Sequence, residues 1–293
     1  MDWKSAGLGL LFATLWSSAF TSARIVVEHA PPFHALSLRF LISGVIALVV
    51  ARMLGEKLSL TRGQWAAVAV FGLCQNAIYL GLNFQAMQTV EASLAAVIAS
   101  MLPLIVAAMG RAVFGDRLSP VGYLGLVGGF AGVVLIMSGR VGAGADIVGV
   151  GLCLVGAMAL AVATLLARGM AGGGNVWTVV GLQMLVGSAA LAVIGVSTET
   201  LVVNWTLDLG LAFVYTTLGP GLAATVIWFH LIGRIGATRA ATFHFLNPFL
   251  GVAIAAVVLG ETMGPRDVVG VAIVAAGILA VQLSRTPPKA VKA

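Results

Sequence analysis

The sequence predicts an all-α integral membrane protein, with ten transmembrane helices arranged as two inverted five-helix repeats around a central cavity. Three observations predict this fold class. The 293 residues are 60% hydrophobic and only 9% charged, which is more apolar surface than one soluble core can bury. The apolar residues fall into ten long stretches, and a stretch of 45 residues occurs twice, 145 positions apart.

The ten apolar stretches each have about the 20 residues that a transmembrane helix requires. The links between them are short, and several carry turn or cap residues. Ser119, for example, is expected to cap a helix that begins at Pro120. The expected spans are 5–27, 33–53, 64–86, 91–111, 118–138, 146–168, 175–197, 207–233, 237–259 and 265–284.

The repeat aligns residues 92–136 with residues 237–281 without a gap. Eleven of the 45 pairs are identical, among them Pro103 with Pro248. Long-period similarity of this kind indicates two structural halves. We expect a first five-helix repeat in residues 1–140, a second in residues 141–284, and a disordered cytoplasmic tail in residues 285–293.

The distribution of lysine and arginine predicts the orientation. With a cytoplasmic N-terminus, 12 of the 16 basic residues fall on the cytoplasmic side, as the positive-inside rule favours. Both termini are then cytoplasmic. Because five spans is an odd number, the second half must enter the bilayer from the opposite face. Inverted repeats are typical of transporters that bind their solute near the midplane, between the halves.

Other classes of protein fit the sequence poorly. The chain is basic, with a formal charge of +6, but its basic residues stand singly between apolar runs instead of forming a nucleic-acid surface. Cys74 and Cys153 lie inside apolar runs and are interpreted as small core residues. The sequence has no metal-binding or phosphate-cradling motif. We expect no enzyme activity and no cofactor; the expected partners are a small-molecule solute and the lipid bilayer, and a monomer fits the sequence.

Several motifs resemble those of the drug/metabolite transporter superfamily, in its ten-helix branch of paired EamA-type domains. They are Trp16–Phe20, Leu38–Phe40, Ala92–Pro103, and the Gly115–Pro120 link together with its copy that begins at Gly260. The resemblance covers nearly the whole chain, and it is greatest to bacterial inner-membrane exporters of aromatic amino acids. It implies a basket of ten helices with a central cavity, and efflux of amino acids or related metabolites. Arg24 and His244 depart from the family pattern.

Span 3 carries the densest group of polar residues. At about 100° per residue, Gln75, Asn76, Tyr79 and Asn83 share one face of the helix, and such groups tend to face the bundle interior. They either contact the solute, which we favour, or form hydrogen bonds between helices. The copy of Gln75-Asn76 in span 8 is the pair at positions 220 and 221, Pro-Gly, where we expect the helix to bend or break.

The remaining candidates are single residues, and each has two interpretations. Trp16 stacks on an apolar solute group or is a packing aromatic. His244 lines the cavity or is a buried neutral histidine. Arg24 and Arg39 either pair with a substrate carboxylate or with Glu91 at an outer gate, or extend to the interface. The predicted substrate-binding residues are Trp16, Gln75, Asn76, Tyr79, Asn83, Ser100, Tyr215, Pro220, Trp228, His244 and Asn247, and the predicted gate or hinge residues are Arg24, Arg39, Pro103, Gly219, Gly221 and Pro248.

None of the ten acidic residues falls in the middle of a span. The sequence therefore favours uniport or solute exchange over proton antiport through a buried carboxylate, and His244 is the one ionisable group expected deep enough to carry a proton instead. We expect export of aromatic or neutral amino acids, or related metabolites, by alternating access. Nucleosides, nucleotide sugars and lipophilic cationic drugs are the alternative solutes, and a membrane enzyme or scaffold is disfavoured.

Overall fold

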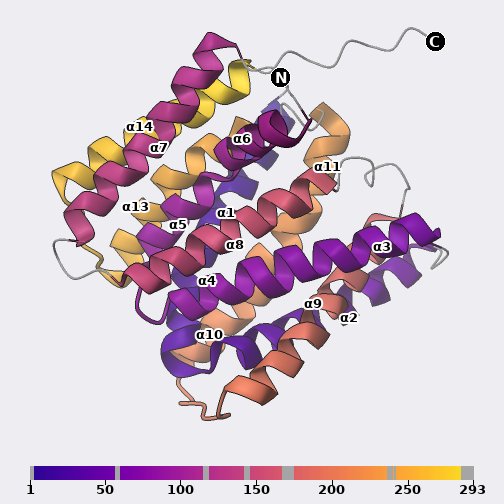
Figure 1. Ribbon diagram of the computed structural model, residues 1–293. Coiled ribbons are helices and arrows are strands. Elements are labelled where there is room, and N and C mark those ends of the chain that lie inside the picture. Colours follow the sequence, from indigo (N-terminus) through magenta and orange to yellow (C-terminus); the bar gives the residue numbers. More distant parts are fainter. Residues whose placement is uncertain are drawn as a thin grey trace, which may run out of the picture.

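The computed structural model describes residues 3–56, 60–114, 119–141, 146–166, 175–235, 240 and 242–284. Every element within these ranges is a helix (Figure 1). The tail 285–293 and the link residue Asp116 lie outside them. The helices are α1 (Trp3–His29), α2 (Pro32–Met53), α3 (Arg62–Phe71), η1 (Gly72–Leu80), α4 (Gly81–Ala86), α5 (Ala92–Ser100), α6 (Leu102–Phe114), α7 (Pro120–Val141), α8 (Ile147–Leu166), α9 (Val176–Thr198), α10 (Leu207–Thr216), η2 (Thr217–Ala223), α11 (Ala224–Ile235), η3 (Thr242–Leu246), α13 (Asn247–Leu259) and α14 (Pro265–Ser284).

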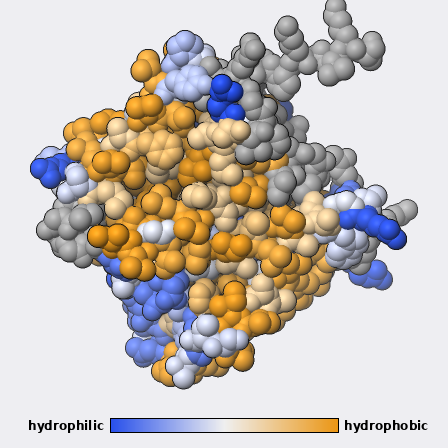
Figure 2. All heavy atoms as spheres, viewed as in Figure 1, coloured by the Kyte–Doolittle hydropathy of each residue, from blue (hydrophilic) through white to orange (hydrophobic). Residues whose placement is uncertain are grey.

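The predicted fold class, an all-helical membrane protein, is confirmed. Within the described residues, nine helical stretches are long and apolar enough to cross a bilayer, and Phe243–Leu259 is a shorter apolar helix. Apolar side chains cover much of the face drawn in Figure 2, and hydrophilic residues gather toward its margins. Trp3 and Trp205, both about four-fifths exposed, lie beside helix ends, where tryptophan favours the membrane interface.

Helices α2 and α9 form an antiparallel pair in which each is capped by a carboxylate that follows the other. Glu199, directly after α9, accepts hydrogen bonds from the backbone N–H groups of Phe33 and His34 at the start of α2, at 2.9 and 3.0 Å. Glu56, shortly after α2, accepts from the N–H of Thr178 at the start of α9, at 2.9 Å. Negative charge stabilises helix N-termini, so these contacts hold the pair together at both ends.

Helices α7 and α14 form a second antiparallel pair, at the edge of the molecule opposite to α2 and α9 (Figure 1). A Cβ added to Gly125 would lie 2.8 Å from the carbonyl oxygen of Gly277, and one added to Gly132 would lie 2.9 Å from that of Gly270. The missing side chains therefore allow the two backbones to touch. Ser119 caps α7 as predicted, because its Oγ accepts a hydrogen bond from the N–H of Gly122 at 3.2 Å.

Four of the long spans are interrupted, at positions that correspond in the 145-residue register. The π-helical segments η1 and η2 begin at Gly72 and Thr217, 145 positions apart. Spans 4 and 9 change geometry just before Pro103 and Pro248. The α-helical pattern of span 8 is broken at Pro220, as expected from proline's missing N–H. The matching interruption of span 3 was not expected.

Candidate functional site

A chamber of about 40 Å³ lies where α1, α2, η1, α4, α9, η2 and the start of α11 meet. This volume is enough for about one or two water molecules. In this conformation the chamber is therefore closed, with no room for a larger solute. Polar and aromatic side chains share its wall, and no acidic residue is among them. The lining includes Trp16, Phe20, Arg39, Phe40, Gln75, Asn76, Tyr79, Leu80, Asn83, Met184, Pro220, Gly221 and Thr225.

The chamber wall is built from corresponding positions of the two halves of the sequence. Four pairs of lining residues are 145 positions apart, and each pair contributes one residue from either half. The chemistry of the members differs, because one half supplies a cation and two amides where the other supplies a thioether, a proline and a glycine. The pairs are Arg39 with Met184, Gln75 with Pro220, Asn76 with Gly221, and Leu80 with Thr225.

Arg39 is the charged residue of the chamber. It is 5% exposed, so the structure does not agree with the interpretation that its side chain extends to the membrane interface. Its guanidinium lies against η2, where a Cβ on Gly221 would be only 3.1 Å from Nη2. The absence of a side chain on Gly221 therefore makes room for the cation. The guanidinium carbon also lies 5.1 Å from the centre of the Phe40 ring.

The polar residues of span 3 divide into two groups. The amide of Asn76 donates to the carbonyl oxygen of Gln183 on α9 at 3.0 Å, which is the helix-linking role considered as the alternative. Asn83 donates to the carbonyl of Tyr79 at 2.8 Å, and its own Oδ1 is buried without a partner. Gln75 is only partly buried and also lines the chamber.

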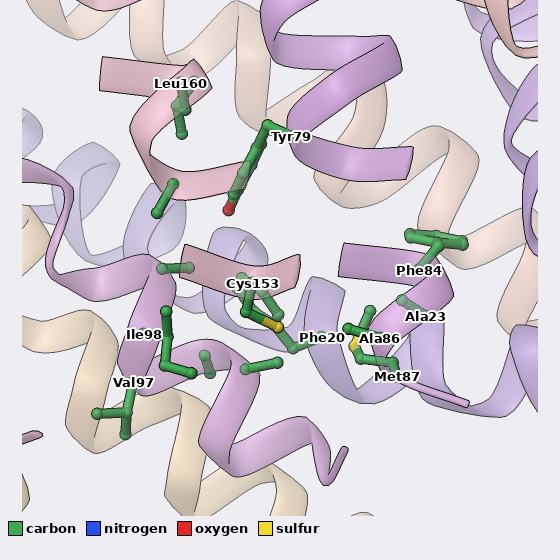
Figure 3. Close-up of a cluster of buried hydrophobic side chains, with 14 of the residues drawn as sticks. Phe20, Ala23, Tyr79, Phe84, Ala86, Met87, Val97, Ile98, Cys153 and Leu160 are labelled. Atoms are coloured by element: carbon green, nitrogen blue, oxygen red, sulfur yellow. The ribbon is translucent and has the colours of Figure 1, made fainter. Parts of the chain in front are cut away.

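Tyr79 is deeply buried, and its ring packs among apolar side chains. Figure 3 shows it within this cluster, beside Leu160. We therefore expect the Tyr79→Ala substitution to create a cavity and lower stability. Tyr79→Phe removes the hydroxyl alone and is the better test of a role in binding.

An aromatic box surrounds His244 beside the chamber. The His244 ring meets the ring of Trp228 at 5.0 Å and that of Phe12 at 5.4 Å, in edge-to-face geometry. Trp16 belongs to both sites, because it lines the chamber and lies 6.2 Å from the His244 ring. Asn247 orients the histidine through a contact of 2.9 Å with Nδ1. The structure thus brings four of the predicted residues together.

The turn between α4 and α5 is held by three carboxylates. Arg24 pairs with Glu28 at 2.7 Å and also donates to the carbonyl of Met87. Glu261 accepts from the N–H groups at the start of α5, at 2.8 and 3.0 Å. Asp146 accepts from the Thr89 hydroxyl at 2.6 Å, and this bond lowers the pKa of Asp146 below its ordinary value. We call these contacts the α4–α5 turn cluster.

Six of the predicted residues belong neither to the chamber wall nor to the group around His244. Ser100 donates to the carbonyl of Ala96 in its own helix at 2.6 Å. Tyr215 contacts Ser18 at 2.6 Å and lines a groove of about 660 Å³ between α1, α10 and α13. The others belong to helix starts, to η2 or to the α4–α5 turn cluster: Pro103, Pro248, Gly219 and Arg24.

The family comparison agrees with this architecture. The model of the EamA-like transporter family matches residues 3–138 and 147–283, once in each half. The chain belongs to the EamA-like transporter family. A crystal structure with 21% sequence identity to this EamA-like chain superposes with a TM-score of 0.72, covering 97% of this chain and 98% of the other, which supports the fold.

Three proteins of similar sequence are named as transporters or efflux pumps. A "probable amino-acid metabolite efflux pump" of Salmonella typhimurium is 30% identical, with 95% of this EamA-like chain and 94% of the other covered. An uncharacterised inner membrane transporter of Escherichia coli is 27% identical, with 94% and 90% covered. An uncharacterised transporter of Bacillus subtilis is 24% identical, with 99% and 94% covered. The chain is therefore a transporter, not an enzyme.

Sequence reasoning missed part of the chamber wall. Phe20, Phe40, Met184 and Thr225 line it but look like ordinary span residues. The 145-residue register was the available signal for Met184, because it relates this residue to the predicted Arg39. Phe20 and Phe40 belong to the Trp16–Phe20 and Leu38–Phe40 motifs, but an apolar ring within a span is interpreted first as a packing residue.

Proposed function

We propose that this EamA-like transporter exports aromatic or neutral amino acids, or related small metabolites, across the bacterial inner membrane by alternating access. The observation that carries the proposal is the position of the chamber, whose wall is shared by corresponding residues of the two halves. In transporters built from inverted repeats, the solute site lies at this junction. Trp16, Gln75 and Arg39 would contact the solute there, since all three line the chamber.

The proposal includes halves that cross the bilayer in opposite senses, with both termini in the cytoplasm. Two observations support it. The corresponding helices α2 and α9 are antiparallel neighbours, and so are α7 and α14. The polar contacts between links also join residues that this topology places on one side, such as Glu261 with Ala92 and Asp146 with Thr89.

Two closures are proposed to alternate around the chamber. The α4–α5 turn cluster would close the outer side, because it ties α1, α4, α5, α8 and the α13–α14 link together through charged groups. The aromatic box of Phe12, Trp16, Trp228 and His244 would close the inner side. Release of one closure while the other holds would expose the chamber to one compartment at a time.

The distribution of charges favours transport without ion coupling. The acidic residues that the structure describes lie at helix ends or in links, and the chamber wall contains none. The carboxylate that a proton antiporter would use is thus not part of this wall. We propose uniport or solute exchange.

Counterflow in liposomes tests the proposed function. Purified protein is reconstituted into vesicles preloaded with unlabelled solute, and entry of the labelled solute is measured. We expect overshoot with phenylalanine and leucine, and none with a nucleoside or a cationic dye. Protein-free vesicles provide the background. Overshoot with the nucleoside or the dye and none with amino acids would replace the proposed substrate class by one of the alternatives.

A further inference from the structure

We propose that Arg39 is the specificity residue of the chamber and binds the carboxylate of the transported solute. The inference rests on the proposed function, because it concerns the same chamber. It goes further by assigning the chemical group that is recognised and the side chain that recognises it. Three features of the described residues carry it: the isolation of the Arg39 charge, the space around its guanidinium, and an unsatisfied acceptor on the same wall.

Arg39 is a buried cation without a protein counter-ion. Among the residues that the structure describes, the ion pairs are Arg24 with Glu28 and His34 with Glu199, and neither includes Arg39. Its Nε is buried with no hydrogen-bond partner. Transfer of an unpaired charge out of water costs several kcal/mol, and a guanidinium cannot relieve this cost by losing its proton. The site is therefore incomplete until an anion enters it.

The surroundings of the guanidinium favour a carboxylate. Arginine presents a planar fork of N–H donors that matches the two oxygens of a carboxylate. The fork lies beside Gly221, and a Cβ there would be 3.1 Å from Nη2 and 3.4 Å from Nε. A side chain on Gly221 would therefore crowd the donors. Glycine keeps this side of the fork open to the chamber.

Asn83 supplies a second contact for a zwitterion. Its amide orientation is defined by the bond that Nδ2 donates to the carbonyl of Tyr79, which leaves Oδ1 as the buried, unpartnered acceptor. An ammonium group is a donor that such an oxygen can accept. The chamber thus offers a donor fork for a carboxylate and an acceptor for an amine, as an α-amino acid requires.

The opposite half adds no second cation. Met184, which corresponds to Arg39, lines the same chamber with an apolar thioether. One cation together with one thioether suits a solute with a single carboxylate and an apolar side chain. A dicarboxylate would leave one negative charge without a partner in a dry site, which is costly.

Competition between three analogues tests the inference. Counterflow of labelled phenylalanine is measured with unlabelled phenylalanine, 3-phenylpropionate, which lacks the amine, or phenylalaninamide, which lacks the carboxylate. We expect the amide to compete at least about tenfold more weakly than the acid, since loss of a charge-assisted bond costs more than about 1.4 kcal/mol. Arg39→Met should abolish the preference, Arg39→Lys should keep part of it, and the exposed Arg266→Met serves as the control that keeps all of it.

Thermal melting in detergent provides the second readout. Without solute, Arg39→Met should melt at the same temperature as wild type or higher, because it removes an uncompensated charge; a structural arginine would give the opposite result. 3-Phenylpropionate should raise the melting temperature of wild type but not of Arg39→Met. Equal stabilisation of both proteins, or equal competition by the acid and the amide in wild type, would overturn the inference. Absence of amino-acid flux in wild type would overturn the proposed function instead, and melting would still decide the role of Arg39.

Discussion

The segments η1 and η2 begin at corresponding positions and have the same π-helical geometry, yet different chemistry holds each in place. Segment η1 packs on α9, with Gly72 against the carbonyl of Gln183 and Asn76 donating to that same oxygen. Segment η2 packs on α2, where Ser43 donates to the carbonyl of Thr217 at 3.2 Å. Only η2 contains a proline.

The two segments share a backbone geometry but differ in their chemical roles. Each π segment opens the regular hydrogen-bonding pattern of its span beside the chamber, a geometry often found at functional sites. The amide of Asn76 in η1 is used to hold two helices together. In η2, Pro220 removes an N–H, and Gly221 clears space for the Arg39 cation. We infer that η1 combines a scaffold role on α9 with the Gln75 contact to the chamber, whereas η2 serves mainly to make room for the Arg39 cation.

The largest expected effect comes from Gly72→Ala. A Cβ at this position would lie 2.6 Å from the carbonyl oxygen of Gln183, so η1 and α9 would have to separate. Overpacking of this kind costs about 1–3 kcal/mol, which thermal unfolding in detergent would register as a lower melting temperature. A Cβ added to Gly63, in the same span, would have no atom within 4 Å. The Gly63→Ala variant should therefore keep the melting temperature of the wild type. Equal melting temperatures of the two variants would contradict the scaffold role of η1.

Gly221→Ala should affect transport more than stability. The new methyl would approach the carbonyl of Thr216 at 2.9 Å and the Arg39 guanidinium at 3.1 Å. Displacement of a binding group by a fraction of an ångström to 1 Å lowers rates by about tenfold or more, so we expect that loss in counterflow. Gly219→Ala, which meets only ordinary contacts at 3.5 Å, is the matched control. Equal rates for both variants would contradict the binding role of η2.

The two polar contacts that hold η1 and η2 should contribute small and similar amounts to the free energy of unfolding. Asn76→Ala removes the bond to Gln183, and Ser43→Ala removes the bond to Thr217. Hydrogen bonds between membrane helices average about 0.6 kcal/mol, which chemical denaturation in mixed micelles can resolve when replicated. A cost for Asn76→Ala several times larger than that for Ser43→Ala would show that η1 depends more on the Asn76 amide than η2 depends on the Ser43 hydroxyl.

The smallest expected effect is that of a proton gradient. His244 corresponds to Ala99 in the first half, and it is the ionisable group of the aromatic box. With uncoupled transport, an imposed pH difference across the vesicle membrane should leave the initial rate of phenylalanine uptake unchanged. A rate that depends on the gradient in wild type but not in His244→Ala would replace uniport by proton coupling through this histidine.

The sequence predicted the membrane fold class, the helix ends and several chamber residues, because these depend on composition, apolar length and the 145-residue register. It did not predict η1, since no proline marks it and its close packing on α9 is a tertiary contact that the local sequence does not show. It also left Arg39 with two interpretations. A count of residues from the helix end places the arginine near the interface, but only the contacts with Gly221 and Phe40 reveal that its side chain turns inward.

The central claim is that the two halves cross the bilayer in opposite senses and meet at the chamber. Single cysteines at Ser119 and Gly264, which correspond in the register, test it most directly in a protein whose Cys74 and Cys153 are replaced by alanine. A membrane-impermeant thiol reagent added to intact cells should label Gly264→Cys and leave Ser119→Cys unlabelled until the cells are opened. Labelling of both cysteines from the same side would contradict the account.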